Sequence, residues 1–158
     1  MITIYTDGSA KGNPGKGGYG IVLISGKHRK ELSQGYRYTT NNRMELLSVI
    51  VAIEAIKTTN ADITIYSDSK YVVESIEKGW VFDWLKKDFK KKKNQDLWLR
   101  FLSVYKKHNI KFIWIKGHHE NTENEICDRL AVKASDKDNI LIDEYFEAMQ
   151  KNKEGLFS

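Results

Sequence analysis

The chain has 158 residues, of which 41% are hydrophobic and 30% are charged, and its formal net charge is +5. These values predict one soluble globular domain with a substantial core. Cys127 is the only cysteine, which excludes an internal disulfide and favours a reducing compartment.

Membrane association and secretion are not expected. The longest strongly apolar run, LLSVIVAI, has eight residues, whereas a membrane-spanning helix needs about twenty. A strand-like run begins at Ile2, which leaves no room for a signal peptide. We therefore expect a cytoplasmic protein.

The first third of the chain predicts strands. Strand-like runs at residues 2–7, 18–25 and 30–39 are separated by turns that contain glycine, which is typical of two successive antiparallel hairpins. The segment that follows, residues 41–59, is apolar on nearly all sides and predicts a buried helix.

The rest of the chain alternates strands and helices. In order, we expect a strand at 62–67, a helix at 69–79, a helix at 96–107, a strand at 110–116, a helix at 122–135 and a short amphipathic helix at 140–150. This order predicts an α/β fold with a mixed sheet flanked by helices. On the last helix one face carries apolar side chains that we expect to pack into the core: Ile142, Tyr145, Phe146 and Met149.

The stretch TDGSAKGNPGKGGYG places six glycines in the thirteen positions after Asp7. A dinucleotide cradle is excluded, because the match to G-x-G-x-x-G leads into a strand instead of a helix N-terminus. Two interpretations remain open: an acid held beside backbone that must approach a substrate closely, or a loose hairpin.

The positive charge is concentrated in KKDFKKKK, residues 86–93, which carries the same net charge as the whole chain. Trp80, Trp84 and Phe89 lie in or near this basic octet. Such a patch suits a nucleic-acid backbone. The alternative is a solvated loop whose lysines only maintain solubility.

Four acids occupy positions that suit a catalytic site, and each also has an ordinary structural explanation. Asp7 at the end of the first strand could form an Asx turn. Glu45 has capping-box spacing from Asn42, and Asp68 stands where a helix N-cap is favoured. Asp128 falls opposite the apolar positions of its helix, so surface exposure would explain it.

Four segments together resemble the signature segments of the ribonuclease H type 1 (RNase HI) family, in the family's order: YTDGSAKGNPGKGGYG, TTNNRMEL, YSDSKYV and KGHHENTENEICDRLA. The resemblance runs from about residue 2 to residue 136. It implies a ribonuclease H-like fold, a five-stranded mixed sheet whose first three strands are antiparallel. It also implies a catalytic domain at 1–136, followed by a tail at 137–158 whose short amphipathic helix packs on or near that domain.

The resemblance implies an endonuclease that hydrolyses the RNA strand of RNA–DNA hybrids, leaving 5′-phosphate and 3′-hydroxyl ends. Asp7, Glu45, Asp68 and Asp128 match the family's metal-binding carboxylates. With substrate bound they would hold two Mg²⁺ ions, or Mn²⁺ as an alternative, since hard cations prefer carboxylate oxygens. His118 matches the catalytic histidine, a proton carrier, by its position directly after Gly117; the adjacent His119 is the other candidate.

Further matches concern the hybrid. Backbone and side-chain groups that read the RNA strand are implied at Ala10, Gly12, Asn13, Asn41 and Asn42, and Lys70 stands where many relatives have a glutamine that contacts RNA. Groups that contact the DNA strand are implied at Thr40, Trp80 and Asn94, with backbone phosphates bound by Lys90, Lys91, Lys92 and Lys93. We expect a monomer. The alternatives are a junction resolvase or transposase core of the same fold, and a hybrid-binding module that has lost activity.

Overall fold

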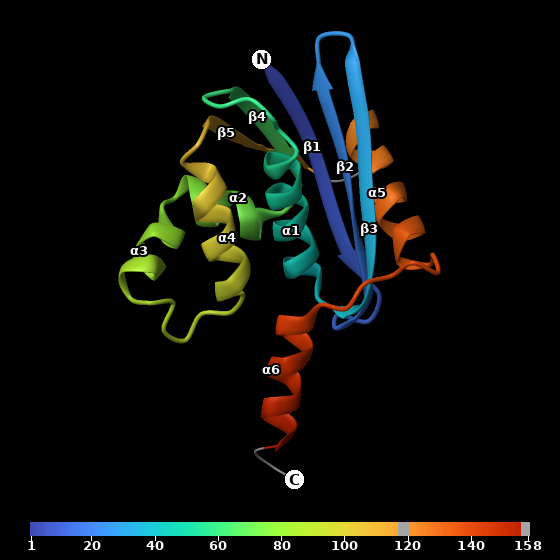
Figure 1. Ribbon diagram of the computed structural model, residues 1–158, viewed down its shortest axis with the longest axis vertical. Helices are drawn as coiled ribbons and strands as arrows, with labels where there is room; N and C mark the ends of the chain where they lie inside the picture. The colour runs from blue at the N-terminus through green and yellow to red at the C-terminus, as the bar shows by residue number, and fades with distance from the viewer. Residues whose placement is uncertain (117–120, 156–158) are drawn as a thin grey trace.

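The protein is built on a mixed five-stranded sheet with the order β3-β2-β1-β4-β5 (Figure 1). The computed structural model describes residues 1–116 and 121–155. β1 (Ile2–Ala10), β2 (Gly15–Ser25) and β3 (His28–Thr39) are antiparallel in succession. β4 (Asp62–Ser67) runs parallel to β1, and β5 (Asn109–Trp114) runs parallel to β4. The expected mixed sheet is confirmed.

Helices cover both faces of this sheet. A Cβ on Gly8 would lie 2.4 Å from the backbone nitrogen of Glu45 in α1 (Asn41–Glu54), and a Cβ on Gly20 would lie 2.1 Å from the carbonyl oxygen of Cys127 in α5 (Thr122–Ser135). Gly20 pairs with Asp7, the neighbour of Gly8, and successive residues of a strand face opposite sides. α1 and α5 therefore pack closely on opposite faces, and the glycines permit that approach.

The remaining helices are α2 (Lys70–Glu77), α3 (Trp80–Lys86), α4 (Gln95–Tyr105) and α6 (Glu144–Gly155). The core lies mainly between α1 and the sheet, and Trp98 and Phe101 of α4 are fully buried against it. The prediction that α1 is a buried helix is confirmed. Its predicted extension to residue 59 is wrong, because the helix ends at Glu54 with Ala55 as its C-cap. Asn60, which adopts the left-handed φ of 53°, could not have continued it.

The glycine-rich stretch is mostly strand. β1 continues past Asp7, because Gly8, Ser9 and Ala10 pair with β2 residues. The prediction that the strand ends at Asp7 is therefore wrong, and the turn is confined to residues 11–14, where Gly12 has φ 85°. Asp7 consequently lies inside a paired strand, which holds its backbone more firmly than a turn would.

The basic octet is folded around an aromatic side chain. Phe89 is buried, its N–H donates to the carbonyl of Trp84 at 2.8 Å, and the Lys92 ammonium lies 5.0 Å from the Trp84 ring centroid. The sequence did not predict α3, which follows Gly79 at φ 76° and ends with Lys86. The first lysine of the octet is thus helical.

The chain after α5 returns to the sheet edge before forming α6. Leu141 makes two backbone hydrogen bonds with β3, both at 2.9 Å. Its N–H donates to the Gly35 carbonyl, and its own carbonyl accepts from the Arg37 N–H. The expectation of core packing is wrong for Ile142, Tyr145 and Met149, which are 46%, 39% and 42% exposed. Figure 1 shows α6 extending away from the sheet. Among the described residues no helix is long and apolar enough to span a bilayer.

Candidate active site

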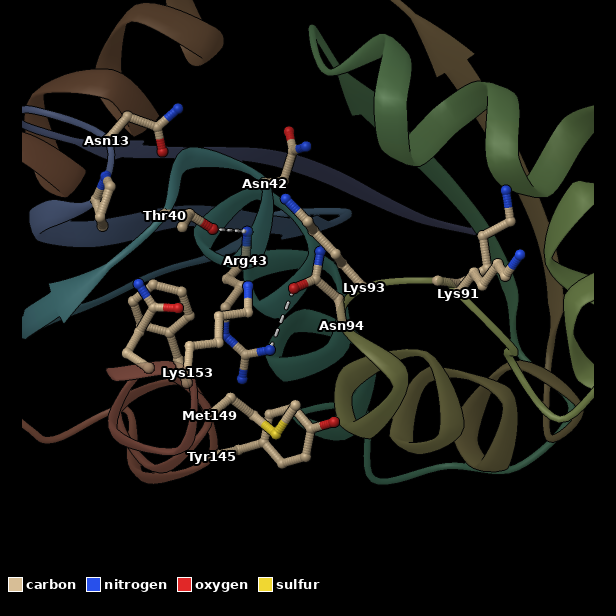
Figure 2. A pocket seen from close by; sticks show the side chains of 14 residues that line it. Asn13, Thr40, Asn42, Arg43, Lys91, Lys93, Asn94, Tyr145, Met149 and Lys153 are labelled. Carbon is tan, nitrogen blue, oxygen red and sulfur yellow. Dashed lines mark hydrogen bonds between the residues drawn. The ribbon is translucent and has the colours of Figure 1, made fainter. Parts of the chain in front are cut away.

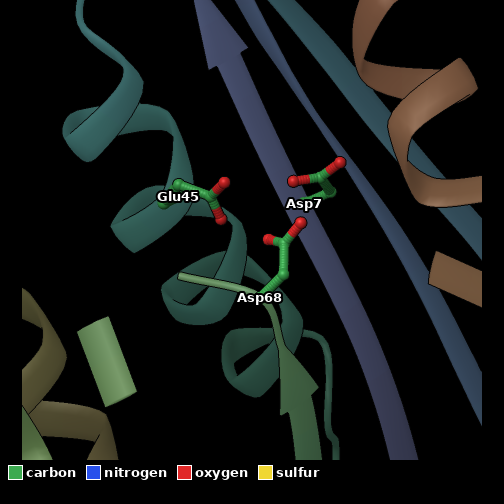
Figure 3. Close-up of side chains that lie close together, drawn as sticks. All are labelled: Asp7, Glu45 and Asp68. Carbon is green, nitrogen blue, oxygen red and sulfur yellow. The ribbon is translucent and has the colours of Figure 1, made fainter. Parts of the chain in front are cut away.

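Three carboxylates from three separate elements meet beside the central strand β1, at the point where β4 ends. Asp7 comes from β1, Glu45 from α1 and Asp68 from the residue after β4, and each offers an oxygen within 4.8 Å of the others. Figure 3 shows the three side chains pointing toward one another. They line a cavity of about 450 Å³. The sequence alone could not bring these acids together, and the structure does.

Glu45 is positioned by the helix start and by the contact of α1 with β1. Its predicted partner in a capping box, Asn42, is not the N-cap: Thr40 accepts a hydrogen bond from the Arg43 N–H at 3.2 Å. Glu45 is thereby left free of a capping role. The close approach at Gly8 brings Glu45 beside Asp7.

Asp68 is not an N-cap either. Ser69 caps α2 by accepting from the Val72 N–H at 3.2 Å. The Asp68 carbonyl accepts a hydrogen bond from Trp114 Nε1 at 3.1 Å, which ties this residue to the end of β5. The structure thus removes the ordinary structural explanation for Asp68 and for Glu45.

Asp128 belongs to α5, which packs on the opposite face of the sheet from α1. It is half-buried and lines the same cavity as the three clustered acids. Its negative charge contributes to the raised pKa of Asp7. Surface exposure therefore does not explain Asp128, because α5 carries it to the rim of the acidic cavity.

Burial and mutual repulsion make the cluster reluctant to ionise. The pKa of Asp7 is raised to about 8, first by burial and then by the negative charge of Asp68, although the Gly8 N–H donates to Asp7 Oδ1 at 2.9 Å. The pKa of Glu45 is raised well above its ordinary value, first by burial and then by Asp7. Closely spaced buried acids are costly unless a cation or a proton neutralises them.

The residues present fit a divalent cation. Glu45 Oε2 is buried and has no hydrogen-bond partner among the described residues. Such an orphaned oxygen, beside two more carboxylates, is suited to ligate a hard cation. Asp7, Glu45 and Asp68 therefore form a site suited to a divalent metal ion.

The glycine-rich turn is joined to the start of α1. Ala10 N–H donates to Asn41 Oδ1, and Asn41 N–H donates to Asn13 Oδ1 at 3.0 Å. Asn41 and Asn42 also line the acidic cavity. The structure thus brings Ala10, Asn13 and Asn41 together. Gly12 has open space beside it, because a Cβ added there would have only the Pro14 carbonyl oxygen within 4 Å.

Two glycines of this stretch have a packing role that the sequence did not reveal. A Cβ on Gly18 or Gly20 would meet the backbone of α5 at 2.5 or 2.1 Å. These two glycines therefore serve the contact between sheet and helix, which neither of the two interpretations of the stretch had included.

Most of the residues expected to contact DNA line a second cavity, which shares Asn42 with the acidic cavity. Asn94 Oδ1 accepts from Arg43 at 3.3 Å and its Nδ2 donates to the Tyr71 hydroxyl at 3.0 Å. Thr40, Asn94, Lys91, Lys92 and Lys93 line one cavity of about 470 Å³. Trp80 lines a neighbouring cavity and is 40% exposed. Lys90 is exposed in the octet beside them.

Lys70 lines the acidic cavity at the start of α2. Its ammonium lies 5.0 Å from the ring centroid of Trp114. Lys70 thus lines the same cavity as Asp7 and Asp68. His118 and His119 lie outside the described residues.

Several residues of this surface were not predicted. Arg43 lies within the motif TTNNRMEL and is buried, and it joins Asp96 and Asp143 from distant parts of the chain. Arg43 could have been recognised as an arginine in an otherwise apolar helix, because a buried charge needs oppositely charged partners. Tyr71, which accepts hydrogen bonds from Asn94 and Trp98, carried no comparable signal.

Residues 1–136 match the family profile of RNase H. The ribonuclease H of Rippkaea orientalis (strain PCC 8801 / RF-1) is 49% identical over 151 residues, with 92% of each chain covered. That of Trichodesmium erythraeum (strain IMS101) is 51% identical over 141 residues, which cover 86% of this chain and 89% of that one.

A solved structure agrees in both fold and sequence. LC9-RNase H1, described as a type 1 RNase H with the type 2 active-site motif, superimposes with a TM-score of 0.77. The two sequences are 31% identical, and the match covers 85% of this chain and 71% of the other.

Proposed function

The chain belongs to the ribonuclease H family, and on that premise we propose that it is a Mg²⁺-dependent endonuclease that hydrolyses the RNA strand of RNA–DNA hybrids. The observation that carries the proposal is the acidic cluster, in which Asp7, Glu45 and Asp68 offer oxygens within 4.8 Å of one another. Curated relatives of this length and identity are ribonucleases H.

We assign the metal to the four carboxylates that line the cavity: Asp7, Glu45, Asp68 and Asp128. Two Mg²⁺ ions bound there would activate a water molecule and stabilise the departing oxygen in an in-line displacement at phosphorus. Products would then carry 5′-phosphate and 3′-hydroxyl ends. The carboxylates must be ionised to bind a cation, so metal binding and proton release are linked.

The chain's own groups would select and orient the substrate. Asn41 and Asn13 hold the turn against α1, and Asn42 lines the acidic cavity. Ala10, Gly12 and Asn42 would contact ribose hydroxyls of the RNA strand. Lys70 can donate but not accept hydrogen bonds, so we assign it a phosphate or base-acceptor contact.

On the other side, Thr40 and Asn94 would bind a phosphate of the DNA strand, Trp80 would pack against deoxyribose, and Lys90 to Lys93 would contact further phosphates. His118 would carry a proton to or from the reacting oxygens, since imidazole titrates near neutral pH.

We propose that residues 1–136 form the catalytic domain, that residues 137–158 pack beside it, and that the enzyme acts as a cytoplasmic monomer. The supporting observations are the family match over residues 1–136 and the single cysteine, which is buried and free.

One assay separates this function from its rivals. A labelled RNA–DNA hybrid, double-stranded RNA, double-stranded DNA and a four-way junction are each incubated with the protein and Mg²⁺. Cleavage of the hybrid's RNA strand alone supports the proposal. Cutting of the junction would indicate a resolvase, and binding of the hybrid without cleavage would indicate a binding module.

A further inference from the structure

The cavity of about 470 Å³ that contains Thr40 and Asn94 has a wall that the family signature segments do not include. That wall is α6, which contributes Tyr145, Phe146, Met149, Gln150 and Lys153. In Figure 2, Arg43 lies between two groups of side chains. Tyr145, Met149 and Lys153 are on one side of it, and Asn94 and Lys93 are on the other. The cavity is thus a groove between the basic octet and the C-terminal helix.

The free charge in this groove is positive on both sides. Arg43 at its floor is already neutralised, because it pairs with Asp96 and with Asp143, each at 2.7 Å. The remaining charged groups are Lys91, Lys92 and Lys93 from the octet and Lys153 from α6. No carboxylate is among the described residues that line the groove. A polyanion suits such a surface.

The lining also offers apolar area of the kind that a sugar requires. Tyr145 and Met149 are 39% and 42% exposed, and the Arg43 guanidinium carbon lies 5.4 Å from the Tyr145 ring centroid. An isolated phosphate would leave these side chains unused. A sugar–phosphate backbone would use both the ammonium groups and the apolar surface.

α6 is held in place at its N-terminal end. Asp143 accepts from Arg43 Nε at 2.7 Å, from Thr39 Oγ1 at 2.7 Å and from the Phe146 N–H at 3.4 Å. On the far face of the helix, Glu147 accepts from Arg37 Nη2 at 2.7 Å. The helix therefore presents Lys153 to the groove and Glu147 away from it.

The groove adjoins the catalytic cavity, because Asn42 lines both. A hybrid whose RNA strand lies at the acids can therefore place its DNA strand past Thr40 and between the two basic walls. We propose that α6 is part of the substrate surface and binds the sugar–phosphate backbone of the DNA strand, with Lys153 as its phosphate contact. This inference rests on the proposed function for the identity of the substrate.

The test compares Lys153→Ala with Lys151→Ala, a matched change on the same helix at an exposed position that does not line the groove. Hybrid binding is measured by fluorescence anisotropy in EDTA, where no cleavage occurs, at several salt concentrations. Loss of one phosphate contact should flatten the log–log salt slope by about 0.7–0.9. It should weaken affinity by about 2- to 5-fold, the range of an exposed ion pair. Lys151→Ala should leave both the salt slope and the affinity unchanged.

A second measurement identifies the strand. Neutral methylphosphonates are placed one at a time along the DNA strand. At one or two positions the neutral linkage should weaken binding of the wild type but not of Lys153→Ala, because the same contact cannot be lost twice. Equal salt slopes for the three proteins, or equal sensitivity to every methylphosphonate, would overturn the inference. A wild type that binds with these slopes but never cleaves would instead refute the proposed function and leave the groove intact.

Discussion

Arg43 on α1 and Asp143 before α6 form a buried ion pair, with Arg43 Nε 2.7 Å from Asp143 Oδ2 and side chains that are 3% and 8% exposed. Arg43 also pairs with Asp96 at 2.7 Å. One guanidinium therefore joins the first helix, the fourth helix and the C-terminal tail beneath the groove that we assign to DNA.

Arg43→Ala should destabilise the fold strongly. It leaves Asp143 buried without its cation, and breaking a buried pair in this way costs about 3–5 kcal/mol. Arg37→Ala is the matched control, because Arg37 also ties β3 to α6, through Glu147, but is 52% exposed. An exposed pair is screened by water and contributes much less to stability than a buried one. Urea unfolding measures the free energy of unfolding of both variants. Equal losses for the two variants would contradict a special role for the buried pair.

The acidic cluster should make metal-free stability depend on pH. Burial and Asp68 raise the pKa of Asp7 to about 8, whereas an unfolded aspartate titrates near about 4. The folded state therefore binds the proton of Asp7 more tightly than the unfolded state does. The free-energy cost of ionising Asp7 in the folded state is absent below about pH 4, grows as pH rises and is complete above about pH 8.

Asp7→Asn removes this titration while keeping an oxygen for the Gly8 N–H. In EDTA its melting temperature should match the wild type near pH 4 and exceed it near pH 8, where each 1 kcal/mol of relief raises it by about 2–4 °C. Asp138→Asn, at an exposed position, should show no such trend. A gain from Asp7→Asn that is the same at both pH values would argue against the raised pKa.

Replacing Lys90, Lys91, Lys92 and Lys93 by alanine should raise KM and leave kcat nearly unchanged, because contacts away from the scissile phosphate contribute uniform binding. We expect two to four phosphate contacts from the octet, each flattening the salt slope of binding by about 0.7–0.9 when lost. Lys27→Ala with Lys30→Ala, in the β2–β3 hairpin, is the control. An unchanged slope in the octet variant would mean that the octet is a solvated surface.

The two adjacent histidines can be separated by mutation. His118→Ala should lower kcat by about 10- to 100-fold, at or below the low end for a proton-transfer group. His119→Ala should retain activity. A reversed result would show that the assignment is displaced by one residue.

The sequence predicted the mixed sheet and most of the helices because hydrophobic periodicity and turn residues act locally. It predicted the start of α1 at Asn41 but not the ends of β1 at Ala10 and of α1 at Glu54, since where a strand or a helix stops depends on pairing and packing with other parts of the chain. Nor could the sequence show that Glu45 and Asp68 have no capping role, because this depends on Thr40 and Ser69 being the N-caps of α1 and α2.

The groove between the basic octet and α6 could not be predicted from the sequence for a different reason. Its floor depends on pairs between residues about a hundred positions apart, such as Arg43 with Asp143, and no local pattern encodes such a contact. The apolar residues of the tail have helical spacing, which predicted core packing. In the structure Tyr145 and Met149 face the groove instead.

If the carboxylate cluster performs metal-dependent hydrolysis of the RNA strand, Asp7→Asn should fail to cleave a labelled hybrid in Mg²⁺. We predict that turnover is abolished while hybrid binding persists, with Asp138→Asn as active as the wild type. Retention of more than about a tenth of wild-type turnover, a loss of under about 1.4 kcal/mol of transition-state stabilisation, would contradict the account.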